Sequence, residues 1–432
     1  MFKQSKYGIY YGWLIVSAGF FISMIGVGAY SGFGVFVIPM SEEFGWNRAT
    51  VSLAASIGAL AGGFSQPFMG RIFDRIGGRR LIMAGLIFSG AANLLLSFTN
   101  HIIHLILVFG VVMAISDSAG TMNTAVSLVA RWFHRRRATA IAIISAGTSM
   151  GGLVLVPFVA FAIPLVGWRN TWLILGLFLL CLALPVAYLI IRNDPSEVGS
   201  LPDGDDSPAG RTTAASIPRG PLEVDYWMQA FGSVPFWQLL GGYFVCGVST
   251  AMISVHYVPY AIEKGFSPSV AATAFGLMSA LNIAGVMLAG MLGDRLGRKN
   301  LLALVYLTRG VGFLVLLTAP GLWGLFGFAV ISGFSWVATV PLTTSLTAEV
   351  YGLKNIGTLS GIVYMAHQIG GALSIQFSGI MKDITGAYTI PFAIGGLCLL
   401  FASVVSFSIQ ERRYSSRYVS VPEPATTQHT AV

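Results

Sequence analysis

The sequence consists mainly of long apolar stretches, each about as long as the hydrocarbon core of a membrane is thick. A helix needs about 20 apolar residues to cross that core, and twelve stretches reach or approach this length. They lie near residues 11–39, 50–69, 81–99, 104–130, 138–165, 169–191, 235–260, 270–292, 300–319, 321–346, 356–381 and 389–409. Only 10% of the 432 residues are charged, whereas soluble domains contain about 25%. The sequence therefore predicts an all-α membrane protein with twelve transmembrane helices.

The basic residues favour one orientation in the membrane. With twelve spans, both termini and every loop after an even-numbered span lie on one side. That side holds all of the 25 Lys and Arg residues except Arg48, Arg169, Lys264 and Lys382 in the opposite loops and Arg309 inside a span. Short loops rich in Lys and Arg stay in the cytoplasm. We therefore expect a multi-pass protein of the cell (inner) membrane, surrounded by lipid, with both termini cytoplasmic. The net charge of +8 then reflects topology, and we expect no nucleic-acid partner.

Two polar segments divide the chain. Residues 193 to about 221 are rich in Pro, Gly, Asp and Ser, which is typical of flexible linkers, and the residues after Arg413 resemble a disordered tail. We predict a six-helix bundle over 1–192, a cytoplasmic linker over 193–233, a second six-helix bundle over 234–413 and a disordered cytoplasmic tail over 414–432.

The two halves share a short motif, GRIFDRIGGRR in the first and GMLGDRLGRKN in the second. At a spacing of 220 residues, the motif repeats Gly70, Asp74 and Arg75 as Gly290, Asp294 and Arg295. A duplicated six-span unit explains this recurrence, and two similar bundles can rock about a central cavity. We expect each Asp to pair with an Arg or a helix N-terminus and so to close the cytoplasmic side in one state. The alternative is that these loops only fix topology.

With these features the chain resembles the major facilitator superfamily. The repeated motif is similar to that superfamily's signature loop, and two six-span halves with a polar linker match its layout. YYGWLIV, FGWNRATVS, ARWFHRRRATAIAIISAGTSMGG and HYVPYAIEKGFSP resemble stretches of the branch that contains monocarboxylate porters and oxalate–formate exchangers. The resemblance implies two pseudo-symmetric bundles and secondary active transport by a functional monomer.

The same resemblance implies a small organic anion of the carboxylate class as the substrate, moved together with protons. One departure is notable, because relatives in this branch often have an Arg in the eighth span where this chain has Val286. The alternative function is efflux of cationic or amphipathic drugs or metabolites by proton antiport. Basic residues at the cavity would favour anions, whereas Asp117 with aromatic residues would favour cations. A membrane receptor that has lost transport is a third alternative.

Ionisable residues inside spans are costly to bury, so each is a functional candidate. Asp117 lies near the middle of the fourth span and is a candidate carrier of the transported proton. The alternative is a neutral Asp that is hydrogen-bonded to a neighbouring hydroxyl. His256 lies near the outer end of the seventh span and is a candidate for the outer gate or for proton uptake. A residue of the membrane interface is the other interpretation.

Further candidates are predicted to contact the substrate. His367, followed by Gln368, lies near the middle of the eleventh span, where exchangers of this branch place a basic residue, and histidine is the residue type that can switch its charge near neutral pH. A packed His that bonds a backbone carbonyl is the alternative. Arg309 lies in the ninth span and keeps its charge, but this span is peripheral in the superfamily, so it is alternatively a structural tie. Additional polar candidates are Tyr30, Asn123 and Asn282.

The sequence lacks motifs for bound cofactors. GTSMGG does not have the Lys-Ser/Thr end of a phosphate-binding loop, so ATP does not drive the process. The three cysteines, Cys181, Cys246 and Cys398, lack metal-site spacing and are interpreted as packing residues. We expect no enzymatic activity, cofactor or metal, and therefore an ion or substrate gradient as the energy source.

Overall fold

The computed structural model describes residues 10–46, 48–204 and 220–419. Across these residues the chain is mostly helical and contains no β-strand. Four basic residues used to predict the orientation, Lys3, Lys6, Arg211 and Arg219, lie outside the described part. The same holds for residues 205–219 of the predicted linker and residues 420–432 of the predicted tail.

The helices of the first half are α1 (Tyr11–Ser31), α2 (Phe33–Phe44), α3 (Arg48–Ile76), α4 (Gly78–Leu96), α5 (Ile102–Leu105), η1 (Ile106–Met113), α6 (Ala114–Gly120), α7 (Met122–Trp132), α8 (Arg137–Leu177), η2 (Phe178–Ala183) and α9 (Leu184–Ile190). The helices of the second half are α11 (Val234–Glu263), α12 (Pro268–Leu296), α13 (Arg298–Thr318), α14 (Gly321–Gly333), α15 (Thr339–Tyr351), α16 (Ile356–Thr385), α17 (Thr389–Phe407) and α18 (Glu411–Tyr414). Between them lie the short helices η3 (Pro195–Val198), η4 (Pro202–Gly204) and η5 (Trp227–Gly232).

Each predicted span corresponds to one helix or to consecutive helices. α8 contains the fifth span and the start of the sixth. The two spans are separated within α8 by a turn of the backbone at Gly167, where φ is +82°. By length and hydropathy alone, 8 helical segments of the described chain qualify as membrane spans. α3, α16 and the pair α14 and α15 fall short of that criterion. α3 and α16 pack against each other at the centre of the molecule, so protein rather than lipid covers part of their surface.

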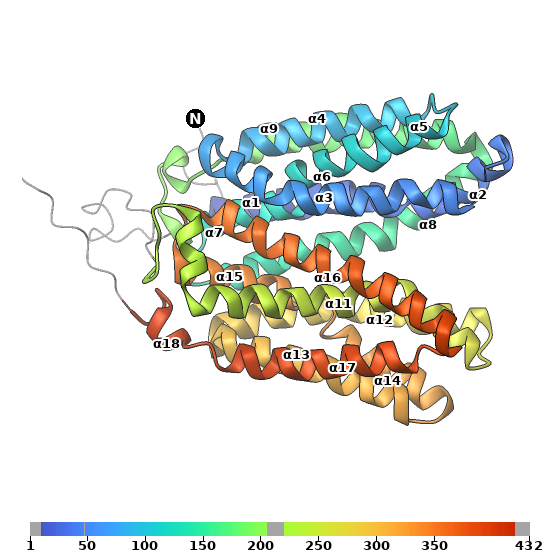
Figure 1. Cartoon of the computed structure of the whole chain (residues 1–432). Helices are drawn as coiled ribbons and strands as arrows, with labels where there is room; N and C mark the ends of the chain where they lie inside the picture. Colours follow the sequence, from blue (N-terminus) through green and yellow to red (C-terminus); the bar gives the residue numbers. More distant parts are fainter. Residues whose placement is uncertain (1–9, 47, 205–219, 420–432) are drawn as a thin grey trace, which may run out of the picture.

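The helices form two bundles, with α1–α9 in one and α11–α17 in the other (Figure 1). The bundles meet where α3 packs on α16 and where α8 packs on α12. Glycines allow this close approach. A Cβ atom on Gly70 would lie 2.1 Å from the carbonyl oxygen of Gly357, and one on Gly290 would lie 2.4 Å from the Cβ of Ala142. Two of the motif glycines are therefore contact residues between the bundles.

Two spans are interrupted near their middle. The fourth breaks between α6 and α7 at Thr121, where φ is −118° and ψ is −144°. The tenth breaks between α14 and α15, at residues 334–338. Interrupted helices leave backbone groups without intrahelical partners, and at membrane depth these are tolerated only where protein or a cavity surrounds them. The breaks therefore indicate where the interior is polar.

The described ends of the linker and the tail pack on the bundles. Asn193 Oδ1 accepts a hydrogen bond from the backbone N–H of Arg79 at the start of α4, at 2.9 Å. Arg417 donates to the backbone carbonyls of Gly293 and Asp294, at 3.1 and 2.8 Å. This position of Arg417 differs from the expected disorder, because the last carbonyls of α12 need donors that the helix itself does not provide.

Candidate functional site

The repeated motif connects the two bundles at one end of the molecule. We call this the motif end: it is where α3 meets α4 and α12 meets α13, and it lies on the left in Figure 1. Asp74 on α3 accepts from the backbone N–H groups of Gly357 and Thr358 at 2.9 Å each, and from the Thr358 hydroxyl at 2.7 Å. These donors lie at the N-terminus of α16, in the other bundle.

The second motif forms the mirror contact. Asp294 on α12 accepts from the backbone N–H groups of Ala138 and Thr139 at 3.0 and 2.8 Å, at the N-terminus of α8. A carboxylate at a helix N-terminus is stabilised by the unpaired N–H groups and by the helix dipole. Each motif Asp thus bonds to a helix N-terminus of the other bundle, and these contacts close the motif end. The motif arginines, Arg75 and Arg295, are exposed.

A buried ion-pair chain supports Asp294. The guanidinium of Arg298 donates to Asp294 at 3.1 Å and also to Glu349 at the end of α15. Ser415 Oγ donates to the second oxygen of Glu349 at 2.8 Å. Glu349 was not among the candidates predicted from the sequence, because it lies close to a predicted span end, where charged residues are common.

At the opposite end the bundles separate around a vestibule. This cavity has a volume of about 860 Å³. It is lined by Val27, Tyr30, Ser31, Phe33, Gly34, Val37, Ala55, Phe109, Thr148, Ser149, Gly152, Leu153, Val156, Pro157, Ser254, Phe275, Gly276, Ser279, Asn282, Trp336 and Val337. The ion pairs near this end, Glu43–Arg169 and Glu263–Lys382, each lie within one bundle. Neither ion pair therefore joins the two bundles.

The vestibule adjoins a smaller central pocket of about 210 Å³. Val27, Thr148, Trp336 and Val337 line both. The other residues of the central pocket are Thr121, Met122, Asn123, Tyr243, Cys246, Thr250, Thr339, Val340, Tyr364 and His367. Both helix breaks contribute to this wall, the fourth span through Thr121 and the tenth through Trp336 and Val337.

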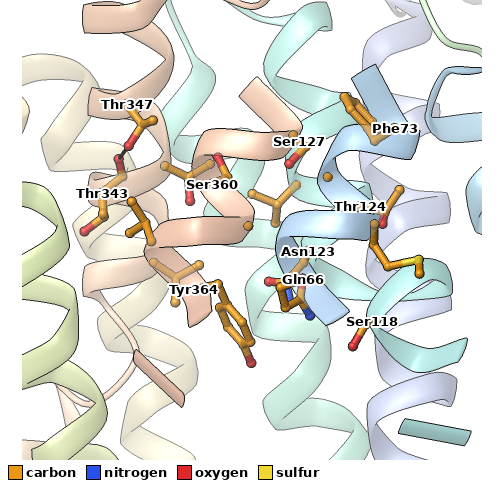
Figure 2. Close-up of a pocket in the computed structure, with 18 of the residues that line it drawn as sticks. Gln66, Phe73, Ser118, Asn123, Thr124, Ser127, Thr343, Thr347, Ser360 and Tyr364 are labelled. Carbon is orange, nitrogen blue, oxygen red and sulfur yellow. Dashed lines mark hydrogen bonds between the residues drawn. The ribbon is translucent and has the colours of Figure 1, made fainter. Parts of the chain in front are cut away.

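Toward the motif end the path narrows to a polar crevice of about 30 Å³. This is room for about two water molecules. Figure 2 shows its side chains, among them Gln66, Asn123, Thr343, Ser360 and Tyr364. Asn123 of α7 and Tyr364 of α16 line it from opposite bundles. The cavities thus narrow from the vestibule toward the closed motif end.

His367 lies in the wall of the central pocket. Its Nδ1 is 3.1 Å from Oε1 of Gln368. Its ring stacks on Tyr364, at 5.6 Å between centroids, and lies 5.0 Å from Tyr243. Cys246 lines the same pocket. The thiol of Cys246 lies 3.0 Å from the Thr339 hydroxyl, so this cysteine contributes to the pocket, which the interpretation as a packing residue did not include.

Arg309 lies one layer behind that wall and is fully buried. Its guanidinium donates to Ser249 Oγ at 2.9 Å and lies 3.4 Å from Thr250 Oγ1 and 3.6 Å from Cys246 Sγ. It also donates to the backbone carbonyls of Ser335 and Trp336, at the break of the tenth span. Arg309 therefore connects α13 to α11 and to the interrupted helix, and its charge faces the pocket through Cys246 and Thr250.

Asp117 and His256 are not among the residues that line these cavities. Asp117 Oδ1 accepts from the Ser89 hydroxyl on α4 at 2.6 Å. Its Oδ2 is shielded from solvent and has no hydrogen-bond partner among the described residues. His256 Nε2 is 3.1 Å from the backbone carbonyl oxygen of Ile375 on α16, and its ring lies 5.1 Å from that of Tyr388.

The other polar candidates line the vestibule, the central pocket or the crevice. Tyr30 lines the vestibule and stacks on Phe109, at 5.0 Å between centroids. Asn123 lines both the pocket and the crevice. Asn282 lines the vestibule, donates to Ser149 Oγ of the other bundle at 2.9 Å and accepts from the backbone N–H of Val337 at 3.0 Å. The break of the tenth span is thus held by Asn282 on one side and by Arg309 on the other.

Two similar helical bundles, joined at one end around a central pocket that opens at the other, form the architecture of an alternating-access transporter. Residues 16–375 match the model of the Major Facilitator Superfamily. The chain belongs to this superfamily and is therefore a multi-pass membrane transporter and not an enzyme.

Similar proteins agree with this assignment. The uncharacterized MFS-type transporter YcxA of Bacillus subtilis (strain 168) is 28% identical over 392 residues, which cover 89% of this chain and 91% of that protein. Monocarboxylate transporter 13 of Bos taurus is 27% identical over 423 residues, which cover 97% and 94%. The predicted resemblance to the monocarboxylate-porter branch is thus confirmed.

Solved structures share the fold at low sequence identity. A double-Trp variant of XylE superimposes with a TM-score of 0.75 at 15% identity, covering 92% of this chain and 95% of that one. A variant of the E. coli fucose:proton symporter FucP gives a TM-score of 0.68 at 17% identity, with coverages of 91% and 98%. The prediction of a major facilitator fold is confirmed.

Proposed function

We propose that this transporter moves a small organic anion of the carboxylate class across the cell membrane together with protons. The observation that carries the proposal is the environment of Arg309. Its guanidinium is permanently charged, fully buried and, among the described residues, without a carboxylate at ion-pair distance. A buried charge of this kind favours binding of a mobile counter-ion.

The central pocket suits that counter-ion. Thr250 and Cys246 separate the guanidinium from the pocket, and charges attract more strongly across so short a distance inside a protein than they do in water. Hydroxyl groups of Thr250 and Thr339 and the ring of His367 line the same pocket, and each can donate a hydrogen bond to a carboxylate. Arg309 then attracts the anion from behind, and the residues of the wall contact it.

The position of Asp117 supports an anion rather than a cation as the transported substrate. Efflux of cationic solutes, the alternative function, requires a carboxylate at the cavity. The residues that line the vestibule, the central pocket and the crevice include neither Asp nor Glu. Asp117 is instead turned toward Ser89 within its own bundle.

Asp117 is nevertheless the better placed of the two proton candidates. Its oxygen Oδ2, which is buried and unpaired among the described residues, can hold a proton that neutralises the carboxyl in a low dielectric. His256 bonds to a backbone carbonyl, which is typical of a structural role. Asp117 also lies on α6, one helical turn before the break of the fourth span at Thr121. A movement of this break would therefore change the surroundings of Asp117.

The distribution of basic residues supports a direction of transport, from the exterior into the cell. In the described chain, Lys and Arg concentrate in the loops of the motif end, which supports a cytoplasmic position for this end. The vestibule then opens to the exterior, and the state described here is ready to accept an external substrate. We propose uptake into the cell by a functional monomer, since a single chain surrounds the whole path.

Transport in proteoliposomes tests the proposal. Purified protein should accumulate a labelled carboxylate when an inward proton gradient is imposed, and should not accumulate a labelled cationic dye. His367→Gln should raise KM about tenfold or more, because one hydrogen bond to a charged group contributes about 1.5–3 kcal/mol. His256→Gln is the matched control, a His of the same bundle away from the pocket, and should leave KM within about twofold. Accumulation of the cation and not of the acid would reject the proposal.

A further inference from the structure

The vestibule and the central pocket differ in chemistry and in size. The central pocket, of about 210 Å³, contains the hydroxyl, thiol and imidazole groups described above. The vestibule, of about 860 Å³, has mainly aromatic and aliphatic walls, including Phe33, Phe109, Leu153 and Phe275. A three-carbon acid would occupy the first space and leave the second to water.

Three glycines widen the vestibule. Gly34, Gly152 and Gly276 line it from α2, α8 and α12. A Cβ atom added to any of them would meet no other atom within 4 Å. These glycines therefore differ from Gly70 and Gly290, which face another helix at contact distance. Close helix packing does not require them, and each leaves space free that a larger side chain would fill.

Trp336 lies where the two spaces join, since it lines both. Its indole Nε1–H is buried and finds no acceptor among the described residues. A buried donor without a partner is costly, and buried tryptophans usually have one. A polar atom of a bound substrate at this junction would supply the acceptor.

We infer that the substrate is an amphipathic monocarboxylate, with its carboxylate in the central pocket and a bulky aromatic or branched body in the vestibule. The inference rests on the proposed function, since it uses the same anion site. The donors and Arg309 lie at the inner end of the cavity and the apolar walls at the outer end, so they fix the orientation of the molecule. Gly34, Gly152 and Gly276 set how large the body is.

Burial of the body determines selectivity among acids. Each CH2 group moved from water into an apolar site contributes a factor of about four in affinity. Affinity should therefore rise along a series of straight-chain acids until the vestibule is filled. A transporter for three-carbon acids would show no such rise.

Calorimetric titration of the purified full-length chain tests the inference. The probes are propionate, pentanoate, heptanoate and 3-phenylpropionate, together with 3-phenylpropanamide, which lacks the charge. We expect Kd to fall about fourfold per added CH2, 3-phenylpropionate to bind more tightly than propionate, and the amide to bind at least about tenfold more weakly than its acid. Equal binding of acid and amide would reject the anion site itself. If the acids bind better than the amide but do not differ among themselves, only the inference about the body fails.

Glycine variants give an independent test. Gly276→Leu should reduce the preference for heptanoate over propionate by about tenfold or more, because the added side chain fills space that the body would occupy. Gly152→Leu should act in the same direction from the other bundle and serves if the first variant does not fold. Gly379→Leu is the control, since a Cβ there also meets nothing within 4 Å but the residue lines none of the three cavities. An unchanged preference in both vestibule variants would overturn the inference.

Discussion

The contact between Asp74 and the N-terminus of α16 gives the sharpest prediction. Its carboxylate accepts three hydrogen bonds from Gly357 and Thr358, across the seam between the bundles. Asp74→Asn has nearly the same shape, but it removes the charge and turns one acceptor oxygen into a donor. We expect it to shift the protein toward a state in which the motif end is open.

The size of the shift follows from these contacts. A hydrogen bond to a charged group contributes about 1.5–3 kcal/mol net, and a neutral one about 1 kcal/mol. The charge itself contributes roughly 0.3–1 kcal/mol at a helix N-terminus. Asparagine retains one acceptor oxygen, so the closed state should lose about 2–3 kcal/mol. This corresponds to a change of roughly 30- to 150-fold in the equilibrium between closed and open.

Hydrogen–deuterium exchange measures this shift at a distance from the substitution. The amides of Ala138 and Thr139 bond to Asp294 at the second contact, and they exchange when the motif end opens. In Asp74→Asn their exchange should accelerate by the factor given above. Arg75→Gln is the control, since this neighbouring side chain is exposed, and it should leave exchange unchanged. Unchanged exchange in Asp74→Asn would show that this contact does not hold the closed state.

Four further changes have defined outcomes. Arg309→Ala removes the donor to two backbone carbonyls at the break of the tenth span and should lower the melting temperature, at a cost of about 1–3 kcal/mol per unpaired group; an unchanged melting temperature would contradict its structural role. Asp117→Asn should abolish accumulation driven by a proton gradient and leave substrate exchange active, whereas normal accumulation would exclude Asp117 from coupling. Gly70→Val places a Cβ 2.1 Å from a backbone oxygen of α16, so it should raise exchange at the motif end as Asp74→Asn does, and normal protection would refute the close contact. Burial lowers the pKa of His134 from 6.5 to about 4. Between these pH values the unfolded state binds the proton and the folded state does not, so the stability of the fold falls as pH decreases. His134→Gln should reduce that fall, and identical pH profiles of the melting temperature in the two proteins would contradict the prediction.

Much of the architecture is predictable from local sequence. Apolar length predicted the spans, including the separations at Gly167 and before Gly321. The repeated motif indicated two similar halves, and the helix N-termini were among the expected partners of Asp74 and Asp294. Each of these features depends on residues that lie close together in the chain, and backbone hydrogen bonding in lipid leaves few alternatives to a helix.

The site was less predictable. His367 was a candidate from its position in a span, but Cys246 and Trp336 carried no signal in the sequence, since such residues also pack helices in any bundle. Arg309 was identified as a candidate, yet its place behind the pocket wall depends on contacts with α11 and with the break between α14 and α15. Gly276 was not distinguishable from the other glycines. A feature that could have directed attention to this region is the small polar stretch around Ser335, where the tenth span breaks.

The sequence by itself determined that the chain crosses a membrane, how its helices divide into two related halves and which loops carry the basic residues. Apolar length, charge and repetition are properties of the chain alone. The tertiary structure decided which face of each helix points inward: Asp117 toward Ser89, His367 toward the pocket, and glycines either to a seam or to open space. The position of a residue along its span sets its depth in the membrane, and this position can be read from the sequence. Successive residues of a helix are rotated by about 100°, so their side chains point in different directions. Which of these directions faces inward depends on packing between helices that are far apart in the chain.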